Sequence, residues 1–317
     1  MIERERIMKV KTYEYESATG QCDIKAWQWY PENRKPKAAI LIHHGMAEHS
    51  GRYKNVINAL VNDYGYAVFM NDMANHGQSN FNEELLGYFG AKDGWKNIIK
   101  DAKTLFDIMK SEYPDKKTII CGHSMGSMIM RSFINFYGNP FDAAIFIGTS
   151  GKNPLAKASL ALTDALAKIK GPTYKTQQLY EVGFADYDKP FEHRTRYDWG
   201  IRDTKSVDDY VADPKCGFLF TVAGYNDLAQ LVINCNSDEW FSNVGVYVPV
   251  LFLSGDKDPV GNYGKGIVEV YDKLKKTGHE KVTMKLYGNA RHEILNELNK
   301  ESVYEDMNNW IQNVVLK

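Results

Sequence analysis

The sequence predicts an α/β fold built on a mostly parallel, doubly wound sheet, with an inserted helical cap. Short apolar, strand-like runs alternate with helix-like segments through most of the chain, which is the pattern of βαβ units with right-handed crossovers. The alternation stops at about residue 150 and resumes after about residue 244. We therefore expect a core made of residues 1–149 and 245–317, and a cap at residues 150–244.

Two strands are expected at the start, at residues 10–15 and 24–30, because the first alternates in the way an antiparallel hairpin does. The later strand-like runs are continuously apolar, as in strands covered by helices on both faces. These core strands are expected at residues 38–42, 66–70, from 118 onward, 143–148, 248–254 and 282–287. Core helices are expected at residues 53–61, 95–110, 124–137, 266–276 and 302–315, and cap helices at 155–170 and 219–234.

Composition narrows the function classes. The 317 residues are 44% hydrophobic and 25% charged, as in ordinary globular proteins. Lys+Arg 39 against Asp+Glu 40, without a basic block, argues against a nucleic-acid partner. Residues 1–6 carry both signs of charge with no apolar run behind them, so no secretory signal is expected, and no run approaches the ~18 apolar residues of a membrane span. The four cysteines, Cys22, Cys121, Cys216 and Cys235, are scattered and include no C-x-x-C pair, which predicts reduced thiols in a cytoplasm. The sequence implies no metal or organic cofactor.

The stretch that carries the chemistry is Gly-His-Ser-Met-Gly at residues 122–126. It lies between an apolar strand and a helix-forming segment, which is the context of a G-x-S-x-G nucleophile elbow. A tight turn displays a serine hydroxyl to both a base and a substrate carbonyl, and its glycines leave room for the strained backbone. Ser124 is therefore the candidate nucleophile, and the Met125 amide at the start of the helix is a candidate oxyanion donor.

An acid and then a histidine should follow the elbow, on loops after the later strands. The strand expected at residues 248–254 runs into a loop with Asp256 and Asp258, and the strand at 282–287 runs into a loop with His292. His292 would take the proton of the nucleophile, and the carboxylate would orient the imidazole. Spacing alone does not separate Asp256 from Asp258.

The second oxyanion donor should come from the loop after the strand at residues 38–42, where the Met46 amide is the best candidate. A metal-binding reading of His43 and His44 is poorly supported, because adjacent histidines point differently and no third zinc ligand is suitably spaced. We expect His123, next to the nucleophile, to be directed away from the reaction.

Several of these stretches together resemble the monoacylglycerol lipases and the lysophospholipase-like serine hydrolases grouped with them. Residues 44–53 resemble their H-G-x-x-E-H-S-x-R-Y signature, and residues 71–79 resemble their D-x-x-G-H-G-x-S loop, with Ala74 and Asn75 where glycine is usual nearby. Residues 122–126 match the elbow, and residues 291–293 match R-H-E. The resemblance implies the α/β-hydrolase fold, and its G-x-x-D pattern at residues 255–258 selects Asp258 as the acid. It fades across the cap.

The leading hypothesis is a carboxylic ester hydrolase for lipid-like substrates, monoacylglycerols or lysophospholipids first, acting through an acyl-enzyme on Ser124. A short-chain carboxylesterase, a peptidase of the same fold and a non-catalytic binding module are the alternatives. A cap with an exposed apolar rim could also make transient contact with a membrane surface. Apolar cap residues would either line an acyl tunnel or pack the cap on the core: Leu155, Leu160, Leu162, Phe218, Leu219, Phe220, Leu228, Leu231 and Trp240.

Overall fold

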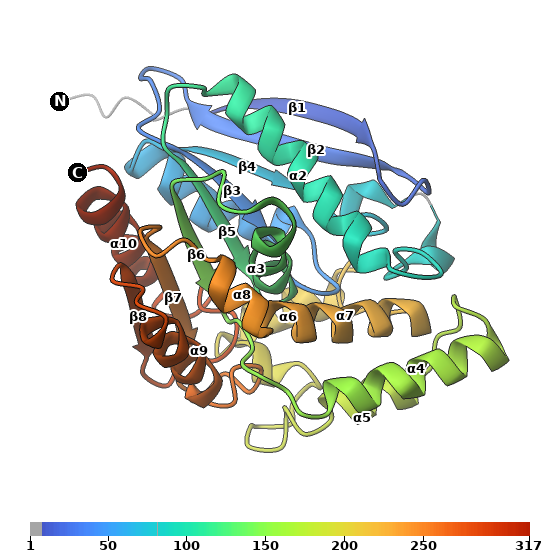
Figure 1. The fold of residues 1–317 in the computed structure, drawn as a ribbon. Coiled ribbons are helices and arrows are strands. Elements are labelled where there is room, and N and C mark those ends of the chain that lie inside the picture. Colours follow the sequence, from blue (N-terminus) through green and yellow to red (C-terminus); the bar gives the residue numbers. More distant parts are fainter. Residues whose placement is uncertain (1–7, 81) are drawn as a thin grey trace.

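The computed structural model describes residues 8–80 and 82–317, and residues 1–6, where no secretory signal is expected, lie outside the described residues. Eight strands form one sheet in the order β1-β2-β4-β3-β5-β6-β7-β8 (Figure 1). β1 (Met8–Glu16) and β2 (Asp23–Pro31) pair antiparallel, as do β2 and β4 (Ala67–Asn71). All remaining neighbours in the sheet pair parallel, and they add the strands β3 (Ala39–His43), β5 (Thr118–His123), β6 (Ala143–Ile147), β7 (Val250–Gly255) and β8 (Val282–Tyr287). The predicted α/β fold is therefore confirmed.

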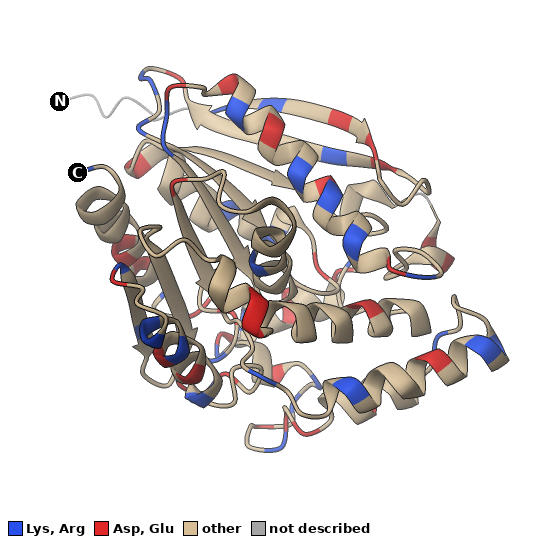
Figure 2. Ribbon diagram, viewed as in Figure 1, with Lys and Arg blue, Asp and Glu red and all other residues tan. Residues whose placement is uncertain are grey.

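Helices cover both faces of the sheet. Strand side chains alternate between the faces, so Leu41 of β3 belongs to one apolar cluster while Ile40 and Ile42 belong to the other. The first cluster includes residues of α2 (Gly94–Glu112), α3 (Met125–Tyr137) and α9 (Lys265–Lys276). The second includes residues of α1 (Lys54–Asn58) and α10 (Lys300–Trp310). The central strands carry no charge, whereas α2 and α9 carry both signs (Figure 2).

Between β6 and β7 lies a mainly helical stretch, residues 150–244, which we call the β6–β7 segment. Its helix α7 packs on α2 and α3 of the core, and α4 packs on α7 (Figure 1). The sequence predicts α4 and α7 but not the shorter α5, α6 and α8, whose apolar spacing covers too few turns. The bounds are α4 (Ala156–Lys170), α5 (Gln177–Phe184), α6 (Thr204–Ala212), α7 (Val222–Cys235) and α8 (Asp238–Asn243).

Two of the predicted helices are not α-helical along their whole length. The one expected at residues 53–61 is a 3-10 turn (Ser50–Tyr53), then α1, then a π-helical turn (Ala59–Asp63). The last helix likewise ends in a π-helical turn (Ile311–Val315), where the Leu316 amide donates to the Ile311 carbonyl. Apolar spacing predicts that a face is buried, but α and π turns bury similar faces. Within the described residues, no helix is both long and apolar enough to cross a bilayer.

Candidate active site

The serine turn follows directly from the close approach of α3 to the sheet. Ser124 lies between β5 and α3 with φ at +53°, a conformation that non-glycine residues adopt only when their surroundings enforce it. A Cβ atom at Gly122 would lie 2.3 Å from the Gly126 carbonyl oxygen, and one at Gly126 would lie 2.2 Å from the His43 carbonyl oxygen. Only glycine fits at both positions. The turn therefore displays Ser124 at the carboxyl edge of the strands.

An imidazole and a carboxylate from the last two strand ends meet beside this turn. The Nδ1 atom of His292 lies 2.9 Å from Oδ1 of Asp258. Asp258 is fully buried, and it also accepts hydrogen bonds from the Ser254 hydroxyl (3.1 Å) and the Val260 amide (2.9 Å). Burial alone would raise the pKa of the Asp258 carboxyl, but His292 and these two donors outweigh it and the pKa falls below its usual value. The carboxylate is thus ionised and points at the ring.

Asp256, the competing carboxylate, lies elsewhere. Its Oδ1 atom accepts a hydrogen bond of 2.7 Å from the Asn289 amide at an exposed turn. Of the two acids that spacing leaves open, the structure brings Asp258 to His292 and leaves Asp256 at the surface.

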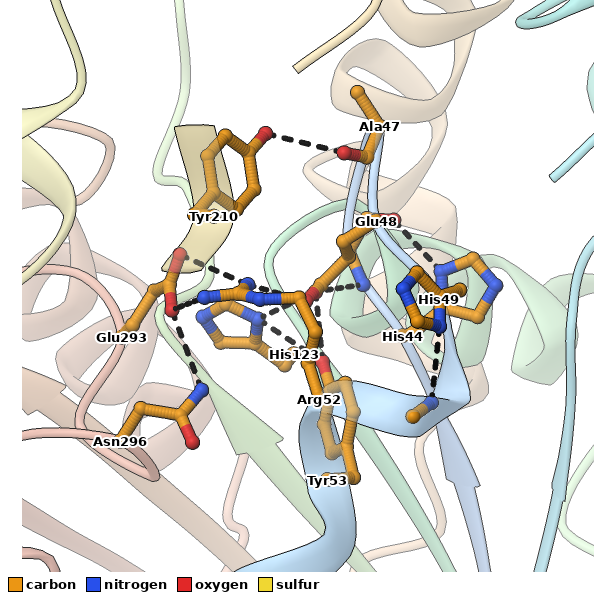
Figure 3. Close-up of polar contacts among 12 residues, drawn as sticks. His44, Ala47, Glu48, His49, Arg52, Tyr53, His123, Tyr210, Glu293 and Asn296 are labelled. Carbon is orange, nitrogen blue, oxygen red and sulfur yellow. Dashed lines mark hydrogen bonds and ion pairs between the residues drawn. The ribbon is translucent and has the colours of Figure 1, made fainter. Parts of the chain in front are cut away.

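A buried cluster around Glu48 holds the loop after β3 (Figure 3). Its Oε1 atom accepts hydrogen bonds from the Gly45 amide (2.6 Å) and the Tyr53 hydroxyl (2.8 Å), and lies 3.3 Å from Nδ1 of His123. Its Oε2 atom pairs with the Arg52 guanidinium at 2.7 Å. Burial alone would raise the pKa of the Glu48 carboxyl, yet its contacts with His123 and Arg52 keep this pKa well below the usual value. The ionised carboxylate therefore fixes the backbone at Gly45.

His123 corrects one expectation from the sequence. It is not directed away from the reaction, because its ring centroid lies 4.8 Å from that of His292 and its Nε2 atom lies 3.3 Å from the His292 carbonyl oxygen. Burial would lower the pKa of His123, but the hydrogen bond and charge of Glu48 outweigh it and raise the pKa. Sequence analysis also did not assign roles to Glu48 and Arg52, although the E-H-S-x-R-Y part of the signature contains both.

Both predicted oxyanion donors adjoin the serine. Met125 opens α3, and Met46 follows Gly45, where a Cβ atom would lie 3.2 Å from the Cβ of Ser124. Met46, Met125, Ser124 and His292 all line one cavity of about 480 Å³. These four predicted site residues, from three separate loops, therefore share one chamber, and Asp258 lies buried outside its wall.

The β6–β7 segment forms the opposite wall of this cavity. Of the nine apolar residues considered for a tunnel, Leu162, Phe218 and Leu228 line it. Phe220, Leu231 and Trp240 are instead buried in the apolar core, and Leu155 is 68% exposed. Three of the nine residues thus line the cavity, and three others pack in the core. Other apolar side chains of the wall were not singled out from the sequence: Leu179, Val182, Phe184, Trp199 and Val232.

One group of described side chains has atoms close enough to hold a metal ion, namely His49, Asp213 and Cys216. The Gly51 amide donates to Nδ1 of His49, so the ring proton lies on Nε2 and donates to Asp213 at 2.8 Å. Burial raises the pKa of the Cys216 thiol. The imidazole and the carboxylate thus hydrogen-bond to each other, and the buried thiol keeps its proton.

Comparisons with known proteins show the family of the chain. The family described as serine aminopeptidase, S33, matches residues 34–299. The chain belongs to this family. Among the relatives of known name, a monoacylglycerol lipase of Mycolicibacterium smegmatis is 26% identical over 89% of this chain and 90% of its own length. The human monoglyceride lipase is 26% identical over 89% of this chain and 84% of its own.

Solved structures extend the comparison to the whole fold. A thermostable carboxyl esterase from Bacillus coagulans, in complex with glycerol, is 30% identical with a TM-score of 0.90 over 98% of this chain and 100% of that chain. The α/β-hydrolase fold and the resemblance expected from the motifs are both confirmed.

We expect Glu48→Gln to lower the free energy of unfolding by about 3 kcal/mol, because it removes the buried charge that faces Arg52 and His123. Urea unfolding followed by circular dichroism measures the change. Glu301→Gln, at a 74% exposed side chain, serves as the control and should change stability by less than about 0.5 kcal/mol. Equal stability of the two variants would show that the Glu48 charge does not hold the loop.

Proposed function

We propose that this protein is a serine hydrolase that cleaves carboxylic esters of lipid-like substrates, monoacylglycerols or lysophospholipids first. One observation carries the proposal: the strained Ser124 turn and the His292–Asp258 pair face a cavity of about 480 Å³ with an apolar wall. The names of the relatives support it, since two are monoacylglycerol lipases and one solved neighbour is a carboxyl esterase in complex with glycerol. The protein is a carboxylic ester hydrolase.

The reaction follows from the placement of the groups. The Ser124 hydroxyl attacks the ester carbonyl while His292 takes its proton, and the amides of Met46 and Met125 donate to the developing oxyanion. The imidazolium then protonates the leaving alcohol and an acyl-enzyme remains. Water, deprotonated by His292, releases the fatty acid. Asp258 holds the imidazole in the required tautomer and stabilises its charged form.

The β6–β7 segment acts as a cap in this proposal, and its apolar wall would receive the acyl chain. A peptidase would instead need a carboxylate in the cavity to bind a substrate amino terminus. Four acidic side chains of the β6–β7 segment that could bind an amino terminus are engaged elsewhere: Asp186 with Lys189, Asp188 with His193, Asp203 with Ser206, and Asp208 with Arg194. Three glutamates line the cavity: Glu48 and Glu293 both pair with Arg52, while Glu269 is an exposed residue of α9. An ester substrate fits this wall better than an amino terminus does.

A membrane surface is the proposed place of substrate uptake. Leu155, the N-cap residue of α4, and Leu162 and Ile169 within the helix follow one another at intervals of about two helical turns and are 68%, 42% and 75% exposed. Val182 of α5 is 73% exposed, and Leu162 and Val182 also line the cavity. This apolar face lies at the cavity, so docking it on lipid would bring the entrance to the substrate. We also propose a cytoplasmic location, with which the four free thiols agree.

Loss of the proposed triad should abolish turnover. Ser124→Ala and His292→Ala should each lower kcat by about 10⁴ or more, and Asp258→Asn by a similar order. Asp256→Asn is the matched control, and it should stay within about threefold of wild type because Asp256 contacts only an exposed turn. Steady-state kinetics on a p-nitrophenyl ester measures all four. A large fall in kcat for Asp256→Asn together with a small fall for Asp258→Asn would reverse the assignment of the acid.

The substrate class is tested by kcat/KM across p-nitrophenyl esters from acetate to palmitate, beside 1- and 2-monoacylglycerols and lysophosphatidylcholine. We expect a maximum at medium or long acyl chains with glycerol esters favoured, because the apolar wall rewards each added methylene. Ser124→Ala gives the background rate. A maximum at acetate or butyrate with a steep fall thereafter would indicate a short-chain esterase, and faster cleavage of aminoacyl amides would indicate a peptidase.

Ile169→Asp should weaken binding to phosphatidylcholine vesicles by about tenfold, because it removes one inserted apolar side chain. Vesicle co-sedimentation measures binding, and hydrolysis of water-soluble p-nitrophenyl acetate should stay unchanged. Tyr247→Asp introduces the same charge at a 78% exposed position outside the β6–β7 segment and provides the control. Equal vesicle binding by the two variants would show that α4 does not contribute to the membrane contact.

A further inference from the structure

The loop that carries the Met46 amide is strained at the next residue. Ala47 has φ at +51°, in the left-handed region that glycine adopts readily and alanine does not. The residue is 5% exposed and lines the cavity together with Met46. A strained conformation of this kind persists only where contacts hold it. The contacts of Ala47 therefore bear on where the Met46 amide points.

The Ala47 carbonyl is held from the β6–β7 segment. It accepts a hydrogen bond of 3.1 Å from the Tyr210 hydroxyl, as Figure 3 shows, and one of 2.9 Å from the Gly217 amide. On the other side of Met46, the Gly45 amide is held by Glu48. The His44–Gly45 and Ala47–Glu48 peptide groups, one residue beyond Met46 on each side, are thus anchored, the first by the core and the second by the β6–β7 segment.

Tyr210 is itself fixed in place. The Arg52 guanidinium lies over its ring at 4.7 Å, and its ring meets that of Tyr197 edge-on at 4.9 Å. The Tyr197 hydroxyl donates to the Gly217 carbonyl at 2.8 Å, and the Gly217 amide also lies 3.1 Å from the Tyr210 hydroxyl. Gly217 has φ at +65°, and a Cβ atom there would lie 2.7 Å from the Tyr197 hydroxyl. The two donors to the Ala47 carbonyl, the Tyr210 hydroxyl and the Gly217 amide, are therefore held in position before substrate binds.

We propose that Tyr210 is a positioning residue for the oxyanion hole. Its hydroxyl holds the Ala47 carbonyl, which keeps Ala47 left-handed and aims the Met46 amide at the oxyanion. This inference rests on the proposed function, in which Met46 supplies an oxyanion donor. It also means that the oxyanion hole is complete only while residues 210–217 of the β6–β7 segment are docked on the loop after β3.

Tyr210→Phe tests the hydroxyl alone, since the phenyl ring keeps its contacts with Arg52 and Tyr197. Loss of one hydrogen bond should lower kcat by about fivefold to tenfold. KM should change by less than about twofold, because the oxyanion forms only in the transition state. The inhibition constant of an alkyl boronic acid, which forms a tetrahedral adduct on serine, should rise by the same factor as kcat falls. The inhibition constant of the fatty acid product should not change.

A second substitution separates positioning from direct substrate contact, since Tyr210 also lines the cavity. Ala47→Gly in the Tyr210→Phe background should recover most of the lost kcat, because glycine adopts the left-handed conformation without the hydroxyl. Failure of glycine to restore kcat would overturn the proposal and make Tyr210 a substrate contact. Unchanged kcat in Tyr210→Phe, or an equal rise in the inhibition constant of the fatty acid, would also overturn it.

Tyr174→Phe is the matched control, because Tyr174 lies in the β6–β7 segment, is 38% exposed and is outside the cavity wall. It should leave kcat and KM unchanged. Thermal unfolding of each variant confirms that the fold is intact. The proposed function fails separately: wild-type protein that does not react with a fluorophosphonate and does not cleave the ester would reject the serine hydrolase before any Tyr210 variant is compared.

Discussion

The contact on which the site depends is the close approach of α3 to the ends of β3 and β5. Gly126 lies so near the His43 carbonyl that no side chain fits there, and Gly122 lies as near to the Gly126 carbonyl. A helix held this close forces the intervening Ser124 into its positive-φ conformation. The helix start then lies beside the serine, where its first amides would face the carbonyl of a bound ester. Steric exclusion, and not a specific polar contact, therefore sets the position of the proposed nucleophile.

Charge then joins the loops that steric packing brings together. Arg52 pairs with Glu48 from the loop after β3 and with Glu293 from the loop after β8, so one guanidinium ties the loop that carries Met46 to the loop that carries His292. His123 makes the same link through Glu48 and the His292 carbonyl. Buried ion pairs add little net stability compared with apolar packing, but they tolerate few geometries. Their value here is that two loops 241 positions apart in the sequence keep one relative position.

Sequence patterns predicted the parts of this arrangement that depend on neighbours along the chain. The β5 strand, the Ser124 turn and the β3 run followed by Met46 are all local signals of apolar periodicity and glycine. The orientation of His123 could not be predicted in this way, because it depends on Glu48, 75 positions away. Asp258 and Asp256 are equivalent by spacing and differ only once the chain has folded around His292. The short helices of the β6–β7 segment depend on the same kind of distant packing.

The β6–β7 segment divides into two parts with different constraints. Residues 192–217 hold the loops that carry Met46 and His292: Glu192 pairs with Arg291, the Gly200 carbonyl accepts from the Glu293 amide at 2.8 Å, and Gly217 donates to Ala47. Residues 162–184 contribute mainly apolar side chains to the cavity wall. Under the proposed function, changes in the second part would alter the surface that meets an acyl chain, while changes in the first part would move the proposed catalytic groups. Substrate preference could then vary through α4 and α5 without disturbing the chemistry, whereas residues around Tyr210 would have to stay compatible with the loops of Met46 and His292.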